Sequence, residues 1–417
     1  MRIAVIGGGI SGMLSWYLLQ RNYDVTLLEA NDYLGGHTAT VDVEVHGQHY
    51  AIDTGFIVFN NWTYPIFNKF IAELGVAALP TEMSFSVKNT QNNLEYNGNT
   101  FASLFAQKRN IFRPSFWKML LEITRFNKLG KQLVAADHTD LDLELGAFLD
   151  KHGFGAGIRD NYLLPMGAAI WSAGLTEMPQ FPVRFFLRFF NNHGLLNIND
   201  RPQWSVIKGG SRSYVEALLA KVGTDKLRLN QKIAGVTRQA DGITVHYADG
   251  KTEQFDKVVF ACHSDQALAL LKDPSVEETA VLGGIAYQQN EVVLHTDTRL
   301  LPVRKAAWAS WNYNLDSQIS DKSTLTYNMN ILQRLTAPVT FCVTLNNTAN
   351  IAKDKILGVY HYAHPVYNPM TIACQQRRAE INGQRNSYFC GAYWYNGFHE
   401  DGARSAVDVA AMLGVSY

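Results

Sequence analysis

The chain has 417 residues, 47% of them hydrophobic and 18% charged, and its formal net charge at pH 7 is zero. This length and apolar content are sufficient to fill two hydrophobic cores. Because the charge is balanced, no basic excess is available for a polyanion, and no nucleic-acid partner is expected.

A glycine-rich turn follows the first predicted strand. Residues 2–6 form a short apolar run that is typical of a buried parallel strand. Three glycines then recur at the spacing Gly-x-Gly-x-x-Gly: Gly7, Gly9 and Gly12. They suit a tight turn, a close approach to phosphate and a close contact between helix and strand. The N-terminal amides of the following helix then face the pyrophosphate of a dinucleotide.

An acidic residue and a second glycine pair indicate which dinucleotide is bound. Residues 24–28 predict a second buried strand, and Glu29 at its end is placed to bind ribose hydroxyls. Gly35 and Gly36 follow shortly afterwards and allow another loop to pass close to the cofactor. Simple nicotinamide dehydrogenases usually lack this pair. The sequence therefore predicts flavin adenine dinucleotide (FAD).

With these motifs, the N-terminus resembles the flavin amine oxidase superfamily, which includes phytoene desaturases and protoporphyrinogen oxidases. More narrowly, it resembles bacterial amine-oxidase-like proteins predicted to bind NAD or FAD. The resemblance extends to segments 53–60, 208–215 and 387–406. It implies an α/β fold with a Rossmann-type FAD domain built from discontinuous segments, and a substrate domain of mixed sheet and helices. The FAD segments are 1–80, 203–270 and 380–417, and the substrate segments are 81–202 and 271–379.

The resemblance also implies particular cofactor contacts. Val236 is expected to contact adenine through its backbone, and the strand ending at Ala261 runs beneath the cofactor. Gly391 touches the pyrophosphate, and the final helix points its N-terminus at the isoalloxazine, where its dipole stabilises negative charge. The expected cofactor-binding residues are Gly7, Gly9, Ile10, Ser11, Gly12, Glu29, Ala30, Gly35, Gly36, His37, Thr38, Gly55, Phe56, Val236, Ala261, Gly391, Phe398, His399 and Glu400.

Further strands are predicted by alternating apolar residues. Residues 232–236 and 243–247, with the Asp-Gly turn at 249–250, indicate a hairpin unit. Segments 306–313, 326–330 and 344–346 predict successive strands rich in aromatic and carboxamide side chains. We interpret these side chains as sheet packing, with orientation of a substrate as the alternative.

Two stretches, 111–121 and 181–190, mix large rings with cations. Such stretches suit a membrane surface or the entrance for an acyl chain, or else a buried helix stripe with snorkelling cations. We prefer the buried helix stripe. Residues 162–175 are the best uncharged stretch but are short and contain a proline, so a core segment is expected there. The nucleotide-binding strand starts at residue 2, which predicts no signal peptide and a cytoplasmic location, with peripheral membrane contact as an extension.

The expected chemistry departs from that of amine oxidases, which typically carry a lysine near flavin N5. Residues 273–298 contain neither Lys nor Arg and offer Tyr287, Gln289 and Asn290 instead. Because the flavin accepts hydride, the protein must only orient a C–H bond, exclude water and move one proton. We therefore expect dehydrogenation or isomerisation of an apolar, lipid-like acyl chain. The electron acceptor is left open.

His399 and Tyr395 are the candidate catalytic residues for the proton, with packing against the cofactor as the alternative role. Two other functions stay open: an amine oxidase whose lysine is Lys208 or Lys305, and a non-catalytic flavin-binding partner of a membrane enzyme. The four cysteines lie far apart, which favours free buried thiols. His361 and His364 fit one helix face, but no neighbouring residue completes a metal set, so no metal is assigned.

Overall fold

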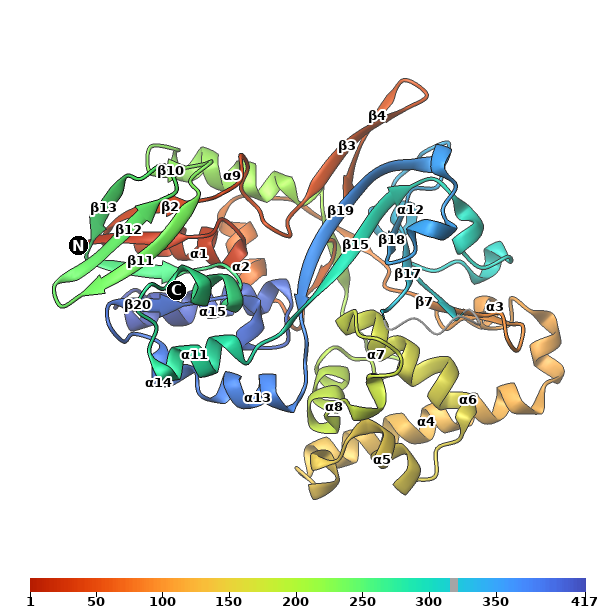
Figure 1. The fold of residues 1–417 in the computed structure, drawn as a ribbon. Helices are drawn as coiled ribbons and strands as arrows, with labels where there is room; N and C mark the ends of the chain where they lie inside the picture. Colours follow the sequence, from red (N-terminus) through yellow and green to blue (C-terminus); the bar gives the residue numbers. More distant parts are fainter. Residues whose placement is uncertain (316–321) are drawn as a thin grey trace.

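The computed structural model describes residues 1–315 and 322–417 (Figure 1). One layer is a five-stranded parallel sheet assembled from the beginning, the middle and the end of the chain. In spatial order its strands are β10 (Leu227–Arg228), β2 (Asp24–Leu28), β1 (Arg2–Ile6), β14 (Lys257–Phe260) and β20 (Ser387–Phe389). The α/β class and the discontinuous Rossmann-type sheet are confirmed, while the exact domain boundaries stay predictions.

The central strand β1 is buried on both faces. Ile3 and Val5 pack with the apolar side chains of helices α1 (Ile10–Leu19) and α15 (His399–Met412). Ala4 and Ile6 point the other way, into the cluster made by the three-stranded sheet β11-β12-β13. This alternation explains the continuous apolar sequence of β1, because a strand covered on both faces exposes neither set of side chains.

The predicted hairpin unit is present. Its antiparallel strands are β11 (Ile233–Gln239), β12 (Gly242–Tyr247) and β13 (Thr252–Phe255). The Asp249-Gly250 turn joins β12 to β13, and Gly250 adopts φ +87°, a conformation that favours glycine. The chain then enters β14 of the parallel sheet, next to β1.

A second layer is a seven-stranded sheet dominated by the long pair β15 and β19 (Figure 1). In spatial order its strands are β19 (Ile356–Pro365), β15 (Tyr287–His295), β18 (Cys342–Leu345), β17 (Leu325–Asn328), β16 (Trp311–Leu315), β7 (Phe85–Asn89) and β8 (Leu94–Asn97). The three predicted aromatic and carboxamide strands correspond to β16, β17 and β18. Their Asn312, Thr326 and Thr344 are buried and hydrogen-bonded within the sheet.

Helices form a third part, below this sheet in Figure 1. Its main helices are α4 (Pro114–Ala135), α5 (Leu145–Lys151), α7 (Leu164–Trp171) and α8 (Val183–Asn192). Seven of the eight residues of α7 are buried, which confirms that 162–175 is a core segment. No helix within the described residues is long and apolar enough to cross a membrane.

Helix α8 confirms the buried-stripe interpretation of 181–190. Phe186, Phe189 and Phe190 are buried in the helical core. Arg184 and Arg188, on the opposite side, form ion pairs with Asp137, and Arg184 also contacts Asp142 at 2.7 Å. The cations of this stretch are therefore neutralised by the protein itself.

The remaining elements connect these layers. The other strands are β3 (Thr40–Val45), β4 (Gln48–Asp53), β5 (Phe59–Asn60), β6 (Ala78–Thr81) and β9 (Trp204–Ile207). The other α-helices are α2 (Pro65–Glu73), α3 (Phe101–Leu104), α6 (Ala156–Ile158), α9 (Arg212–Val222), α10 (Ser264–Leu270), α11 (Val276–Gly283), α12 (Met329–Leu332), α13 (Pro369–Gln376) and α14 (Arg378–Ile381).

Candidate functional site

The turn between β1 and α1 has the geometry of a pyrophosphate cradle. Gly7 adopts φ +106°, and a Cβ on Gly12 would lie 1.8 Å from the Gly7 carbonyl oxygen. A Cβ on Gly9, in contrast, would meet no protein atom within 4 Å. No side chain caps the N-terminus of α1. The backbone amides at the start of α1 therefore have no capping side chain, and the space in front of them is open to a phosphate.

Glu29 is fixed at the end of β2, beside this turn. Its Oε2 accepts a hydrogen bond from the Gly8 amide at 2.6 Å, and its Oε1 accepts one from the Asn31 amide at 2.8 Å. The Glu29 carbonyl also accepts from the Gln231 amide at 2.8 Å. Each carboxylate oxygen keeps a second lone pair, so the residue remains able to bind ribose hydroxyls.

Two further loops converge on the same point because glycines permit it. The Gly35 amide donates to the Gly8 carbonyl at 2.9 Å, and Gly36 adopts φ +58° with its Cβ position 3.2 Å from Gly9 Cα. A Cβ on Gly55 would lie 2.1 Å from the His37 carbonyl oxygen. The predicted glycines thus bring segments 35–38 and 53–56 against the first turn.

The end of the site near α15 is joined by a chain of hydrogen bonds. Thr38 Oγ1 and Tyr214 Oη are 2.6 Å apart, and Tyr214 Oη and His399 Nε2 are 2.9 Å apart. His399 stacks on Phe56 with 3.7 Å between ring centroids. Burial holds the pKa of His399 well below its usual range, so the imidazole is neutral. Tyr214 of the 208–215 segment therefore belongs to this site, although the sequence had not singled it out.

Close packing of α1 and α15 sets the distance between the two helix starts. Ser11 Oγ donates to the Gly402 carbonyl at 2.9 Å, and a Cβ on Gly402 would approach Ile10 Cγ2 to 2.7 Å. The Gly391 amide donates to Ser405 Oγ at 2.8 Å. The closing segment is thereby held against the helix that follows the phosphate turn, while the contacts of Gly391 with the pyrophosphate and of α15 with the isoalloxazine stay predictions.

Several predicted residues have their side chain or backbone engaged by other protein groups. The Glu400 carboxylate accepts from the Ile66 and Phe67 amides at the start of α2. The Val236 carbonyl accepts from the Lys272 amide at 3.0 Å. Tyr395 donates to Asp408 at 2.5 Å. The cofactor role of Glu400 and Val236 and the proton role of Tyr395 stay predictions.

Three imidazoles, one of them from segment 35–38, form a cluster that was not predicted from the sequence. The ring centroid of His37 lies 5.5 Å from that of His364, 5.8 Å from that of His263 and 5.3 Å from that of Tyr362. Burial lowers the pKa of His37 and His263 to about 4 and that of His364 to about 3. His37 has a hydrogen bond with the backbone of Ala363, while its buried Nε2 has no hydrogen-bond partner.

The helical placement of His361 and His364 was wrong. Both lie on strand β19, where residues three apart point to opposite faces. The side chain of His361 is 68% exposed, whereas His364 belongs to the imidazole cluster. Among the described residues, no group of His, Cys, Asp or Glu side chains has a geometry that suits a metal ion.

The buried histidines predict how stability depends on pH. Burial lowers the pKa of His37, His193, His263, His295 and His364 to about 3 or 4. The unfolded chain therefore binds more protons between about pH 6.5 and pH 4, and stability falls on acidification through that range. Asp53, Glu400 and Asp401, whose pKa values burial raises to about 6, 7 and 7, oppose this trend.

With His399, whose pKa burial also lowers, and Asp160, whose pKa burial also raises, six histidines outnumber four carboxyls. We therefore expect the free energy of unfolding to decrease from about pH 6.5 to about pH 5. Urea unfolding followed by circular dichroism measures it. His361→Gln, at an exposed position of β19, should leave the slope unchanged. A urea midpoint that rises on acidification would contradict the neutral state of the buried imidazoles.

A cavity of about 270 Å³ opens next to the imidazole cluster and has mostly apolar walls. Its lining residues are Glu144, Trp171, Ala173, Glu177, Gln180, Phe181, Gln288, His364, Pro365, Val366, Tyr367, Asn368 and Pro369. They come from the residue before α5, from α7, from the segment before α8, from the start of β15, and from the end of β19 with the loop into α13. The cavity thus lies where the helical part meets the long strand pair, and His364 connects it to His37.

Comparison with known proteins agrees with this geometry. The sequence profile of the flavin-containing amine oxidoreductases matches residues 10–307. Over 292 residues, 66% of this chain, the protein is 23% identical to a probable flavin-containing monoamine oxidase A of Dictyostelium discoideum, and spans 60% of that relative. The fold is similar to that of a CLA-producing fatty acid isomerase from P. acnes (TM-score 0.71, 17% identity, 99% of both chains). It is also similar to cyclohexylamine oxidase from Brevibacterium oxydans IH-35A (TM-score 0.70, 13% identity, 99% of both chains).

The family and the residues of the site agree on the cofactor. The open space at Gly9, the uncapped start of α1 and the carboxylate of Glu29 are the groups that an adenine dinucleotide requires. The chain therefore belongs to the flavin-containing amine oxidoreductases and is an FAD-dependent oxidoreductase.

Proposed function

We propose that this protein oxidises or isomerises an apolar, lipid-like acyl chain by hydride transfer to its flavin. The observation that carries the proposal is the cavity beside the imidazole cluster. Its aromatic walls include Trp171 and Phe181, whose ring centroids are 4.5 Å apart, and the buried Tyr367. Such walls exclude water and hold methylene groups by contact rather than by hydrogen bonds.

When bound, the flavin supplies the hydride acceptor, which leaves one proton for the protein to move. His364 is poorly placed to accept it. Asn290 Oδ1 accepts from Asn346, so its amide nitrogen faces His364 Nδ1 at 3.3 Å, and His364 keeps its proton on Nε2. His37 does not line the cavity, but its ring centroid lies 5.5 Å from that of His364 and its buried Nε2 has no protein hydrogen-bond partner. We therefore assign to His37 the role of accepting this proton.

The reductive half-reaction balances, because the bound flavin would supply the hydride acceptor while His37 takes a proton from the neighbouring carbon and a C=C bond forms. In dehydrogenation, an external electron acceptor must then take up the two electrons of the reduced flavin. In isomerisation, the same hydride and proton return at displaced positions. A neutral imidazole suits either course, because loss of hydride makes the neighbouring C–H bond acidic enough for a weak base.

The mouth of the cavity restricts the form of the substrate. Glu144 and Glu177 are exposed at its rim, and no Lys or Arg lines it. Carboxylates at the rim repel a free fatty-acid carboxylate. We therefore infer that the acyl chain enters as an ester, whose carbonyl carries no charge.

The same rim favours a second candidate, oxidation of a cationic amine. The similarity to amine oxidases is consistent with it. However, Lys208 and Lys305, the lysines considered as replacements for the one near N5, are both exposed. This candidate would therefore need a mechanism without either of them.

An anaerobic reduction experiment separates the two. The holoenzyme is mixed with unsaturated phosphatidylcholine in detergent micelles or with benzylamine and cyclohexylamine, and loss of flavin absorbance near about 450 nm is followed. We expect bleaching, or conversion of the acyl chain without net bleaching, with the phospholipid only. Bleaching by amines alone, with peroxide released in air, would replace the proposal by the second candidate.

A variant tests whether the cavity is the route. Ala173 lines the cavity, so the larger side chain in Ala173→Phe should obstruct it and slow the reaction with the acyl substrate by at least about tenfold. A tenfold change corresponds to about 1.4 kcal/mol. Ala306→Phe, at an exposed position, is the matched control. Equal rates in both variants would show that the substrate enters elsewhere.

A further inference from the structure

The basic aromatic stretch at 111–121 differs from the one on α8. Residues 101–121, which include α3, the following turn and the start of α4, expose large apolar side chains. The exposed fractions are 73% for Phe101, 43% for Ile111, 85% for Phe112, 42% for Trp117 and 67% for Leu121. These five side chains are a third of the fifteen large hydrophobic ones that are exposed in the described residues, yet they occupy only this short segment.

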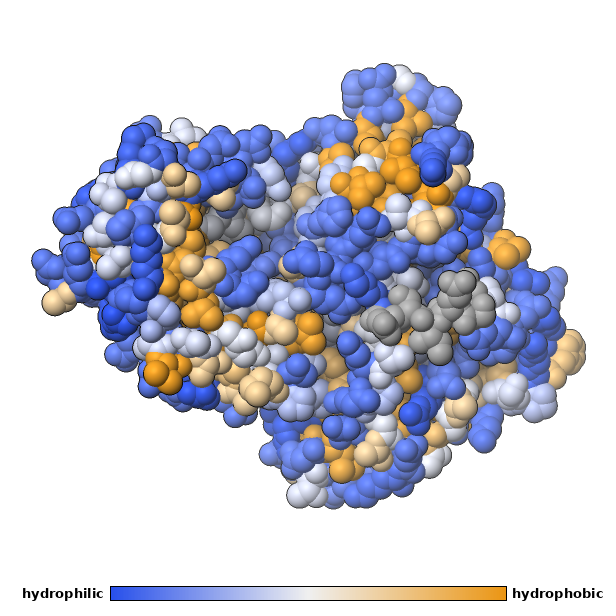
Figure 2. Space-filling view, viewed as in Figure 1, coloured by the Kyte–Doolittle hydropathy of each residue, from blue (hydrophilic) through white to orange (hydrophobic). Residues whose placement is uncertain are grey.

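Ring contacts and one hydrogen bond connect three of these five residues, which together are called the apolar corner below. The ring centroids of Phe101 and Phe105 are 4.8 Å apart, and those of Phe105 and Trp117 are 5.3 Å apart. Trp117 Nε1 donates to the Ile111 carbonyl at 2.8 Å. The face drawn in Figure 2 is hydrophilic over most of its area, with further apolar groups near β3 and β4 and along the left part of the molecule. A contiguous exposed apolar surface of this kind marks an interaction site.

Four cations lie in the same segment as the apolar corner, and none of them forms an ion pair within the described residues. Residues 96–121 contain no Asp or Glu, but they contain Lys108, Arg109, Arg113 and Lys118. Within the described residues these four form no ion pair, although Arg109 donates to the Asn93 carbonyl and Arg113 to Asn110. Their charge is available to an external anion, in contrast to that of Arg184 and Arg188 on α8.

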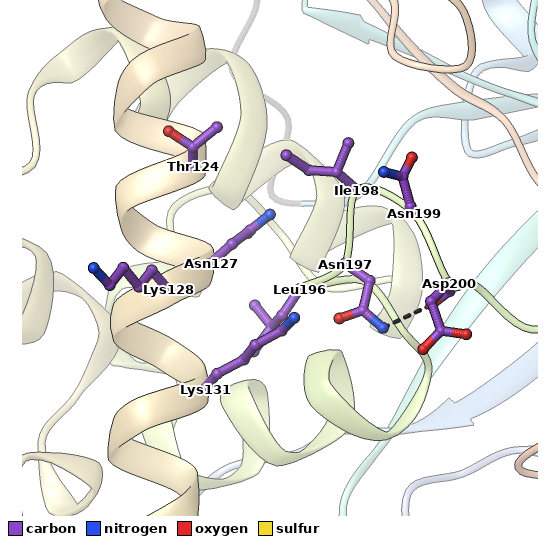
Figure 3. Close-up of a pocket in the computed structure, with 9 residues that line it drawn as sticks. All are labelled: Thr124, Asn127, Lys128, Lys131, Leu196, Asn197, Ile198, Asn199 and Asp200. Atoms are coloured by element: carbon purple, nitrogen blue, oxygen red, sulfur yellow. Dashed lines mark hydrogen bonds between the residues drawn. The ribbon is translucent and has the colours of Figure 1, made fainter.

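The same surface continues along α4. Trp117, Leu121, Thr124, Lys128 and Lys131 are spaced by four and three residues and therefore share one face of the helix. The stripe is apolar at its start and basic at its end. At the basic end, Thr124, Lys128 and Lys131 line an open hollow of about 430 Å³ with Ile198, which is 66% exposed, and Asp200 (Figure 3).

We propose that the apolar corner and the exposed face of α4 dock on the surface of a bilayer containing anionic phospholipids. Aromatic and aliphatic side chains enter the boundary between headgroups and acyl chains, while Lys and Arg meet the phosphates. Charge complementarity supports this occupant over a protein partner, because the corner offers four cations and no acidic residue. The proposal does not depend on the flavin chemistry.

Sedimentation with vesicles tests it. The FAD-loaded protein is mixed with sucrose-loaded vesicles of phosphatidylglycerol and phosphatidylcholine in equal amounts, or of phosphatidylcholine alone. We expect binding to the anionic vesicles that weakens as NaCl is raised, and weaker binding to the zwitterionic vesicles. Absence of binding to the anionic vesicles, or equal binding to both, would overturn the proposal.

Matched variants locate the contact. The double variant Phe112→Asp with Leu121→Asp should lower the vesicle partition coefficient at least about tenfold, since it places charge where apolar groups enter the interface. Val276→Asp is the control, because Val276 is 82% exposed at the start of α11 and precedes two glutamates. Flavin content and circular dichroism establish that each variant is folded. Equal partition of the double variant and wild type would overturn the assignment of the surface.

A second pair of variants tests the charges. Lys108→Glu with Lys118→Glu should remove the preference for anionic vesicles. Lys353→Glu with Lys355→Glu should not, because these exposed lysines lie just before β19, outside the proposed face. If both pairs reduce binding equally, only the overall charge matters and the proposed face is wrong. These readouts are independent of turnover, so failure here and failure of the acyl-chain proposal are distinguishable.

Discussion

Gly9→Ala is expected to leave the fold intact and to weaken FAD binding by at least about tenfold, or about 1.4 kcal/mol. Gly9 adopts φ −73° and ψ −177°, an extended conformation that alanine accepts, and the new Cβ meets no protein atom within 4 Å. The protein alone therefore tolerates the methyl group. The dinucleotide does not, because the methyl group projects into the space before the α1 amides where the pyrophosphate binds.

Two other glycines make this result interpretable. Gly98→Ala adds a methyl group that also meets nothing within 4 Å, but far from the cradle, and should change neither stability nor FAD binding. Gly12→Ala should destabilise the protein itself, since its Cβ would lie 1.8 Å from the Gly7 carbonyl oxygen. The thermal midpoint of the apoprotein and the FAD dissociation constant separate the three cases. If Gly9→Ala bound FAD as tightly as wild type, the pyrophosphate would not lie at this turn.

These glycines were predictable from sequence because their constraint is local. A tight turn, a close approach and a helix start all fall within a dozen residues, and only glycine meets those requirements at Gly7 and Gly12. The imidazole cluster was not predictable. His37, His263 and His364 lie more than a hundred residues apart. His263 stacks on Tyr287 at the start of β15. The pairing of β15 with β19 places Gln288 opposite His364, and His37 packs beside both imidazoles.

The two basic aromatic stretches show a second limit of sequence reasoning. Both combine phenylalanines with cations at helical spacing, so their composition predicts the same alternatives for each. What distinguishes them is the presence of Asp137 and Asp142 beside α8, and the lack of any acidic side chain between 96 and 121. Only the second feature is visible in the sequence. The first depends on how α4 and α8 pack.

His37→Gln is expected to keep FAD and to lower the rate of flavin reduction by the acyl substrate by a factor on the order of 10² to 10⁴. Glutamine still offers a donor toward the backbone at Ala363 but has no nitrogen that accepts a proton. In wild type the base form of His37 is required, so the rate of reduction should rise with pH through an apparent pKa below 6.5, near the lowered value of about 4. Stopped-flow reduction at several pH values measures this limb.

The variant separates two roles that the same residue admits. The sequence assigned His37 to cofactor binding, and in that case His37→Gln should lose FAD while any protein that retains FAD reacts at the normal rate. If His37 moves the proton, the variant retains FAD with an unchanged absorbance spectrum, reacts slowly, and loses the acidic limb of its pH profile. His361→Gln provides the control, because His361 lies on β19 three residues from His364 but is exposed. A normal rate and pH profile in His37→Gln would instead assign the role of proton acceptor to His399. His399 is the first residue of α15, and its neutral imidazole is hydrogen-bonded to Tyr214 of α9.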